Sequence, residues 1–302
     1  MRSHTLLALL VSTLALVACR GPALSIVASA VSETGNSYGN DDDPELVRAA
    51  VPFGLKTMEG LLESQPRHVK LLTALTSSFT QYTFGFVHAD AEDADREGKL
   101  EAARAGRERA RRLFLRARYY GLRGLEEKRE GLSARLAAGR DPAVALRITR
   151  KDDVELLYWT AAAWTLAISD GKGDMGLVAE LPVPIAMMQR ALELDPDWGE
   201  GTLHEFFVTW DGTRSAAEGG GPERARAHLE RALALSMNKK LGPLVSWAEG
   251  VLVMQQDRAE FTRILEAVLR ADPAAEPRHQ LVNVFAQRRA RALLAHADDL
   301  FL

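Results

Sequence analysis

The chain has 302 residues, with 38 lysines and arginines against 41 aspartates and glutamates, and a formal net charge of −3 at pH 7. This slightly acidic balance predicts no nucleic-acid partner. The one cysteine, Cys19, excludes a disulfide within the chain and a cysteine zinc site. A chain of this length exceeds the usual single compact core, so we expect two domains or an extended repeat structure.

The N-terminal segment is typical of a secretory signal, with Arg2 as its basic start and an apolar run over residues 6–17 that is too short to span a bilayer. Leu16, Val17 and Ala18 stand before Cys19 with the spacing of a bacterial lipobox. We therefore predict a signal peptide over residues 1–18 and lipidation of Cys19. An uncleaved anchor helix or an ordinary cleaved signal is the alternative, and either places the body outside the cytoplasm. Arg20, in place of the Asp linked with inner-membrane retention, favours the outer membrane.

The predicted mature chain begins with a tether. Residues 19–43 are rich in Gly, Ser, Asn and Asp and offer little to a core. As a flexible coil this stretch would average roughly 25–30 Å from end to end. No later segment approaches the roughly 20 continuous apolar residues of a spanning helix, so we expect the membrane to be contacted through the lipid alone.

The folded body is predicted to begin at Asp43 and Pro44, which suit the N-cap and first turn of a helix. That helix carries an apolar row at three- and four-residue spacing, formed by Leu46, Ala50, Phe53, Thr57 and Leu61. The next helix begins soon after Pro66 and carries the row Leu72, Leu75, Phe79, Tyr82 and Phe86. Together they predict a helical hairpin.

Helical patterns continue to the end of the chain. One long helix to about residue 127 carries Leu113, Ala117, Tyr120 and Gly124, and another over about 153–168 carries Val154, Leu157, Ala161 and Trp164. Three later helices close on similar phrases at about 196, 237 and 273, spaced 41 and 36 residues apart, close to the roughly 34-residue tetratricopeptide unit. We therefore predict an all-α fold over residues 44–302, built of stacked helical hairpins as a degenerate tetratricopeptide-like α-solenoid.

No constellation in the sequence predicts catalysis. His204 and Glu205 lack the second histidine of a zincin helix, since position 208 is valine, and no phosphate loop or calcium loop is complete. His88 and the acidic residues that follow it fit a solvated connection better than a metal site. We therefore expect a protein that is not an enzyme and that needs no cofactor and no metal.

Aromatic residues are the remaining candidates for a site. Most are expected to pack in the core, but adjacent rings such as Tyr119–Tyr120 and Tyr158–Trp159 point about 100° apart on a helix. One ring of each pair is then available to line a cleft. The candidate ligand-cleft residues are Phe79, Tyr82, Phe86, Tyr119, Tyr120, Tyr158, Trp159, Trp164, Phe206 and Trp210.

Several phrases resemble one family. Residues 44–56, 78–82, 111–118, 120–126 and 159–164 are similar to the T-component (TatT) of tripartite ATP-independent periplasmic (TRAP) transporters. The likeness covers about residues 44–270. It implies a periplasm-facing lipoprotein of tetratricopeptide-like hairpins that forms a homotrimer, with a pore or hydrophobic cleft in each subunit.

The resemblance also implies partners. A T-component docks a periplasmic solute-binding protein (TatP), which delivers ligand to an ion-driven TRAP permease. The expected function is accordingly an accessory transport component that binds this protein and passes a hydrophobic or organic-acid ligand. The alternative is a cell-envelope lipoprotein scaffold that binds proteins and holds no ligand.

Overall fold

The computed structural model describes residues 39–139 and 141–302, and no strand occurs in these ranges. The predicted all-α fold is confirmed, whereas the predicted signal peptide, Cys19 and the tether before residue 39 lie outside the described residues. None of the helices described is long and apolar enough to cross a membrane. The α-helices are α3 (Pro44–Ser64), α4 (Val69–Tyr82), α5 (Ala89–Arg96), α6 (Leu100–Lys128), α7 (Leu132–Ala137), α8 (Pro142–Ala145), α9 (Val154–Asp170), α10 (Met175–Ala179), α11 (Pro182–Leu194), α12 (Thr202–Gly212), α13 (Pro222–Leu235), α14 (Gly242–Trp247), α15 (Val253–Gln255), α16 (Arg258–Arg270), α17 (Gln280–Ala295) and α18 (Ala297–Leu300).

Helix α3 begins where the sequence predicts. The Asp43 carboxylate accepts hydrogen bonds from the backbone N–H groups of Glu45 and Leu46, at 3.0 and 3.1 Å. The predicted buried row is wrong, because Leu46 and Phe53 are 59% and 79% exposed. The row one residue further along is buried instead, because α3 has apolar residues on two adjacent faces and spacing alone does not choose between them. The buried row consists of Val47, Val51, Leu55, Met58 and Leu62.

Helices α4, α6 and α9 pack closely around Gly121. A Cβ atom at this position would lie 2.1 Å from Oγ1 of Thr160 in α9 and 3.0 Å from Cγ2 of Thr76 in α4. Glycine thus lets α6 approach two helices at once. The predicted rows on α4 and α9 are confirmed here, since Leu72, Leu75, Phe79, Val154, Leu157, Ala161 and Trp164 are buried.

Three apolar clusters follow one another along the chain and share helices. The first lies among α3, α4 and α6, the second among α6, α9, α11 and α12, and the third among α12 to α17. Each helix hairpin therefore buries its apolar surface against its neighbours, as in a solenoid, and no single core serves the whole chain.

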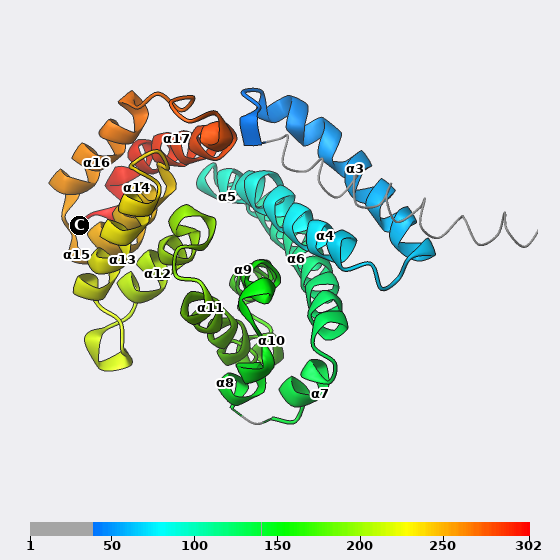
Figure 1. Ribbon diagram of the computed structural model, residues 1–302. Coiled ribbons are helices and arrows are strands. Elements are labelled where there is room, and N and C mark those ends of the chain that lie inside the picture. The colour runs from blue at the N-terminus through cyan, green and yellow to red at the C-terminus, as the bar shows by residue number, and fades with distance from the viewer. Residues whose placement is uncertain (1–38, 140) are drawn as a thin grey trace, which may run out of the picture.

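The array curves until its two ends meet, so that α17 lies beside α3 and α5 (Figure 1). Phe285 of α17 packs edge-on against Phe86, with ring centroids 5.3 Å apart. Arg288 pairs with Glu45 at 3.1 Å, and Arg289 pairs with Glu92 at 2.8 Å. We call these contacts of Phe285, Arg288 and Arg289 the closing seam. Helix α17 thus packs against the N-terminal hairpin.

Two π-helical turns flank the closing seam. The first, η2 (Thr83–His88), carries Phe86, and the second, η7 (Ala248–Leu252), carries Glu249, which pairs with Arg289. Such turns are rare and recur at functional positions, because the extra residue shifts the side chains that follow. Here they bring an aromatic ring and a carboxylate against the same helix, α17.

Candidate functional site

The structure separates the ten candidate aromatic residues by exposure. Phe79, Phe86, Tyr120 and Trp164 are buried, while Tyr119 is 57% exposed. The other five, which are partly exposed, are Tyr82, Tyr158, Trp159, Phe206 and Trp210. Only the partly exposed residues combine access with a packed surrounding, so they are the better candidates for a cleft.

The buried aromatic residues of the N-terminal hairpin belong to a satisfied structural cluster. Tyr120 stacks on Phe79 at 6.0 Å and donates a 2.7 Å hydrogen bond to the buried carboxylate of Glu59. Burial works to raise the pKa of Glu59, but hydrogen bonds from Lys56 and Tyr120 and the charge of Arg116 outweigh it and lower that pKa. Every polar group here has a partner, which indicates a role in packing.

A second set of aromatic residues lies on α9 and at the start of α12. The ring of Tyr158 lies 4.8 Å from that of Trp159, at an interplanar angle of 71°, and 4.9 Å from that of Trp198, at 47°. Trp198 belongs to the turn η5 (Trp198–Gly201) that leads into α12. We call this surface the α9–α12 face; its partly exposed residues are Tyr158, Trp159, Ala162, Thr165 and Leu166 of α9, Trp198 of η5, and Thr202, Glu205, Phe206 and Trp210 of α12.

Three charged residues that the sequence analysis did not select belong to the same face. Glu155 stands one turn before Tyr158, and Glu205 interacts electrostatically with both Tyr158 and Lys240. The Lys240 ammonium donates to the Gly199 carbonyl and, at 2.9 Å, to the Thr202 hydroxyl. From the sequence alone these three residues look like ordinary charged residues on helix surfaces. The one signal that could have selected Glu155 and Glu205 is that each lies within one turn of aromatic residues on the same helix.

Burial shifts the pKa values of the titratable groups on the α9–α12 face. Desolvation raises the pKa of Glu155 and of Glu205, raises that of the Tyr158 hydroxyl, and lowers that of Lys240. Yet Glu155 is exposed and Glu205 and Lys240 are only partly covered. Among the described residues, neither carboxylate accepts a hydrogen bond.

A histidine pair lies behind this face. Nδ1 of His204 in α12 is 2.8 Å from Nδ1 of His228 in α13, and Nε2 of His228 is 3.7 Å from the buried carboxylate of Asp211. Burial, followed by the nearby His228, lowers the pKa of His204 to about 4, and burial also lowers that of His228. Within the ranges described, no group of three or more histidine, cysteine or acidic side chains is arranged to hold a metal ion.

This pair predicts a loss of stability in mild acid. Between pH 6.5 and 4, His204 and His228 become protonated in the unfolded chain but stay neutral in the folded protein. The free energy of unfolding therefore falls as the pH falls. We expect a loss of about 2 kcal/mol from the pair by pH 4, after solvent screening at the open side of His228. Urea unfolding of the wild type and of His204→Gln at pH 7, 5 and 4 measures it. Equal slopes against pH in the two proteins would disprove the role of His204.

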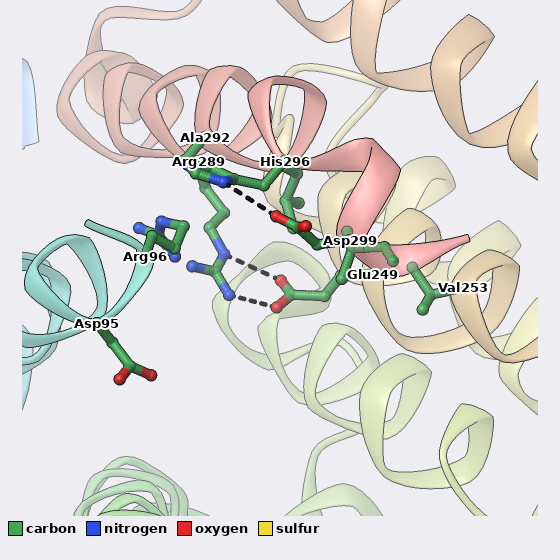
Figure 2. A pocket seen from close by; sticks show the side chains of 10 residues that line it. Asp95, Arg96, Glu249, Val253, Arg289, Ala292, His296 and Asp299 are labelled. Atoms are coloured by element: carbon green, nitrogen blue, oxygen red, sulfur yellow. Dashed lines mark hydrogen bonds and ion pairs between the residues drawn. The ribbon is translucent and has the colours of Figure 1, made fainter. Parts of the chain in front are cut away.

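A cavity of about 540 Å³ lies at the closing seam (Figure 2). Its walls come from α5, η7, α17 and α18, and the guanidinium of Arg289 points at the carboxylate of Glu249. Arg289 also pairs with Glu92, and His296 pairs with Asp299 at 3.4 Å. Because these charges are paired within the protein, the ion pairs hold the seam together and none of these groups is left free for a ligand. A smaller cavity of about 340 Å³ is lined by Arg104, Arg107, Glu108 and Asp170.

Comparison with known proteins decides the family. The family model for the TRAP transporter T-component matches residues 40–301. The chain belongs to this family. As a T-component it is an accessory component of a TRAP transporter, which places it with a transport system of the cell envelope. The match runs beyond the likeness over residues 44–270, so α17 and the closing seam are part of the family's domain.

A relative from Treponema pallidum also aligns with nearly the whole chain. This T-component is 27% identical over 267 residues to a Treponema pallidum (strain Nichols) protein described as an uncharacterized protein. The alignment covers 88% of this chain and 82% of the relative. The similarity therefore spans most of the length of both chains.

Proposed function

We propose that this T-component binds the periplasmic solute-binding protein of its TRAP transporter and exchanges a small ligand with it at the α9–α12 face. The family supports the transport role. The observation that supports the ligand is the aromatic trio of Tyr158, Trp159 and Trp198, whose rings contact one another while each remains partly exposed. Ligand sites are typically lined by apolar and aromatic side chains with a few polar groups, and this face has that composition.

The same proposal includes how the protein is held and assembled. Lipidation of Cys19 would anchor it in the envelope, preferably in the outer membrane facing the periplasm, with the helical body free to meet the solute-binding protein and the TRAP permease. The exposed row of Leu46 and Phe53 on α3 supports contact between copies, in keeping with a homotrimer. The protein would act without catalysis.

Native mass spectrometry of the mature chain carrying Cys19→Ser tests the proposed function. We expect a trimer that takes up the solute-binding protein encoded beside it. An unrelated binding protein should form no complex and should leave the monomer–trimer balance unchanged. Phe53→Glu should shift the protein toward monomer, because a charge would enter an apolar contact. A wild-type monomer that ignores the encoded partner would contradict the proposal and favour an envelope scaffold.

A further inference from the structure

Helix α6 carries a dense run of arginines. Residues 102–125 hold eight arginines and a single acidic residue, Glu108, in a chain whose formal net charge is −3. The eight are Arg104, Arg107, Arg109, Arg111, Arg112, Arg116, Arg118 and Arg123. Positive charge is therefore concentrated on one helix of a protein that is slightly acidic as a whole.

Some of these arginines are paired with carboxylates of neighbouring elements. Arg107 pairs with Asp95 at 2.5 Å, and Arg118 pairs with Glu180 at 2.6 Å. Both arginines are partly covered by the surrounding protein. Their charges are matched internally and are not available to a partner.

The exposed side of α6 is different. Arg109, Arg112, Arg116, Tyr119 and Arg123 follow one another at three- and four-residue spacing, which aligns them along one side of the helix. We call these five residues the arginine row. The first four are exposed, and Arg123 is partly exposed. The row thus presents four guanidinium groups and one aromatic ring on the surface.

Two arginines of the row have no carboxylate partner among the described residues. Arg109 forms no hydrogen bond and no ion pair there. Arg123 donates a 2.6 Å hydrogen bond to the Pro66 carbonyl, which carries no charge. At least two positive charges of the row are therefore not neutralised within the protein.

The other two arginines share their carboxylates with further cations. Arg112 pairs with Glu108 at 3.2 Å, but Glu108 also pairs with Arg111 at 3.1 Å. Arg116 pairs with Glu59, which a lysine of α3 contacts as well. The carboxylates that reach the row are thus too few to neutralise it.

Part of the row is held in a fixed geometry. The guanidinium of Arg116 lies over the Phe79 ring at 5.2 Å, and that of Arg123 lies over the Tyr119 ring at 5.3 Å. Guanidinium groups held in place suit directional pairing with the carboxylates of a folded protein. An anionic lipid surface attracts basic segments by net charge and gains nothing from such fixed positions. The geometry therefore favours a protein partner.

We propose that the arginine row of α6 binds an acidic surface of the solute-binding protein. This names the contact surface for that partner and rests on the proposed function. Tyr119 is 57% exposed within the row, and tyrosine and arginine are the residue types that often dominate the binding energy of protein interfaces. The unmatched positive charge of the row attracts carboxylates that the acidic chain as a whole would repel.

Calorimetric titration of the mature chain carrying Cys19→Ser with the solute-binding protein encoded beside it tests the inference. We expect Arg109→Glu and Arg112→Glu each to weaken binding about tenfold or more, since like charges then face each other. Tyr119→Ala should weaken binding about tenfold through the lost ring contact. The affinity of the wild type should fall as the salt concentration rises, and that of Arg109→Glu should fall less.

Arg291→Glu is the matched control. Arg291 of α17 is exposed and, like Arg109, forms no hydrogen bond or ion pair in the part of the chain that the structure describes. Its reversal changes the net charge as much as Arg109→Glu does, so it should leave the affinity unchanged. Neither side chain supports the fold through a partner, and circular dichroism should show both variants folded. Equal affinity in Arg109→Glu and wild type, or an equal loss in Arg291→Glu, would overturn the inference.

Three further outcomes also count against it. A shift of Arg109→Glu from trimer to monomer in native mass spectrometry would place the row between copies of the chain. Binding to phosphatidylglycerol vesicles that Arg109→Glu abolishes, with the affinity for the partner unchanged, would show that the row meets lipid. A wild type that binds no partner contradicts the proposed function itself, whereas unchanged partner binding in Arg109→Glu disproves only the position of the contact.

Discussion

Replacing Gly121 with alanine is expected to lower the free energy of unfolding by about 2–3 kcal/mol, because the new methyl group has no space. Its Cβ would lie 2.1 Å from Oγ1 of Thr160 and 3.0 Å from Cγ2 of Thr76. Both threonines are fully buried, and each hydroxyl is fixed by a hydrogen bond to a carbonyl one turn earlier in its own helix. Neither side chain can give way, so α6 must move away from α4 and α9.

Gly60→Ala is the matched control. Gly60 also lies inside a helix, α3, but nothing lies within 4 Å of its Cβ position. Alanine there should stabilise the protein by roughly 0.5–1 kcal/mol, since it restricts the unfolded chain and favours helix. Urea denaturation measures the free energy of unfolding of both variants, and an unchanged m-value shows that the change is one of stability. Similar effects of the two substitutions would show that helix propensity, and not the three-helix contact, decides the outcome.

Arg289→Met is expected to cost about 2 kcal/mol, because it removes the shared partner of two carboxylates that are 27% and 41% exposed. Arg289 pairs with Glu249 of η7 and Glu92 of α5, and its side chain is only 26% exposed. Without it, two carboxylates face each other across the closing seam. We expect the melting temperature to fall relative to the wild type. Amide hydrogen exchange should speed up more in α17 than in α9.

The neighbouring arginine provides the control for this prediction. Arg288 pairs with Glu45, but both side chains are well exposed, at 42% and 59%. Arg288→Met should therefore cost less than about 1 kcal/mol, as exposed pairs usually do. If the two variants lost equal stability, the seam would depend on the packing of α17 rather than on the buried charges.

The sequence predicted much of the fold because helix signals are local. The Asp43–Pro44 start, the row on α4 and the row on α9 all appear in the structure. The row on α3 was placed one residue off, since Leu46 and Val47 belong to equally regular rows and only contact with α4 buries the second. The closing seam could not be predicted, because it depends on single residues such as Glu45 and Arg288 that lie 243 positions apart.

The candidate site was predicted in part. Tyr158, Trp159, Phe206 and Trp210 are partly exposed, because adjacent rings on a helix cannot all turn inward. Trp198 and the charges of Glu155, Glu205 and Lys240 were missed, since they come from a turn and from helix surfaces that only the tertiary fold brings together. The charges of Glu155, Glu205 and Lys240 mark these residues as candidates only once the structure shows that burial shifts their pKa values.

The meeting of α17 with α3 also limits how the length of this protein can evolve. An open solenoid gains or loses a hairpin at little cost, because each repeat contacts only its neighbours. Here an extra hairpin would carry Phe285 away from Phe86 and leave the apolar ends of both terminal clusters uncovered. The number of hairpins is therefore fixed in the way that strand number is fixed in a closed barrel, and variation is expected in the loops between them.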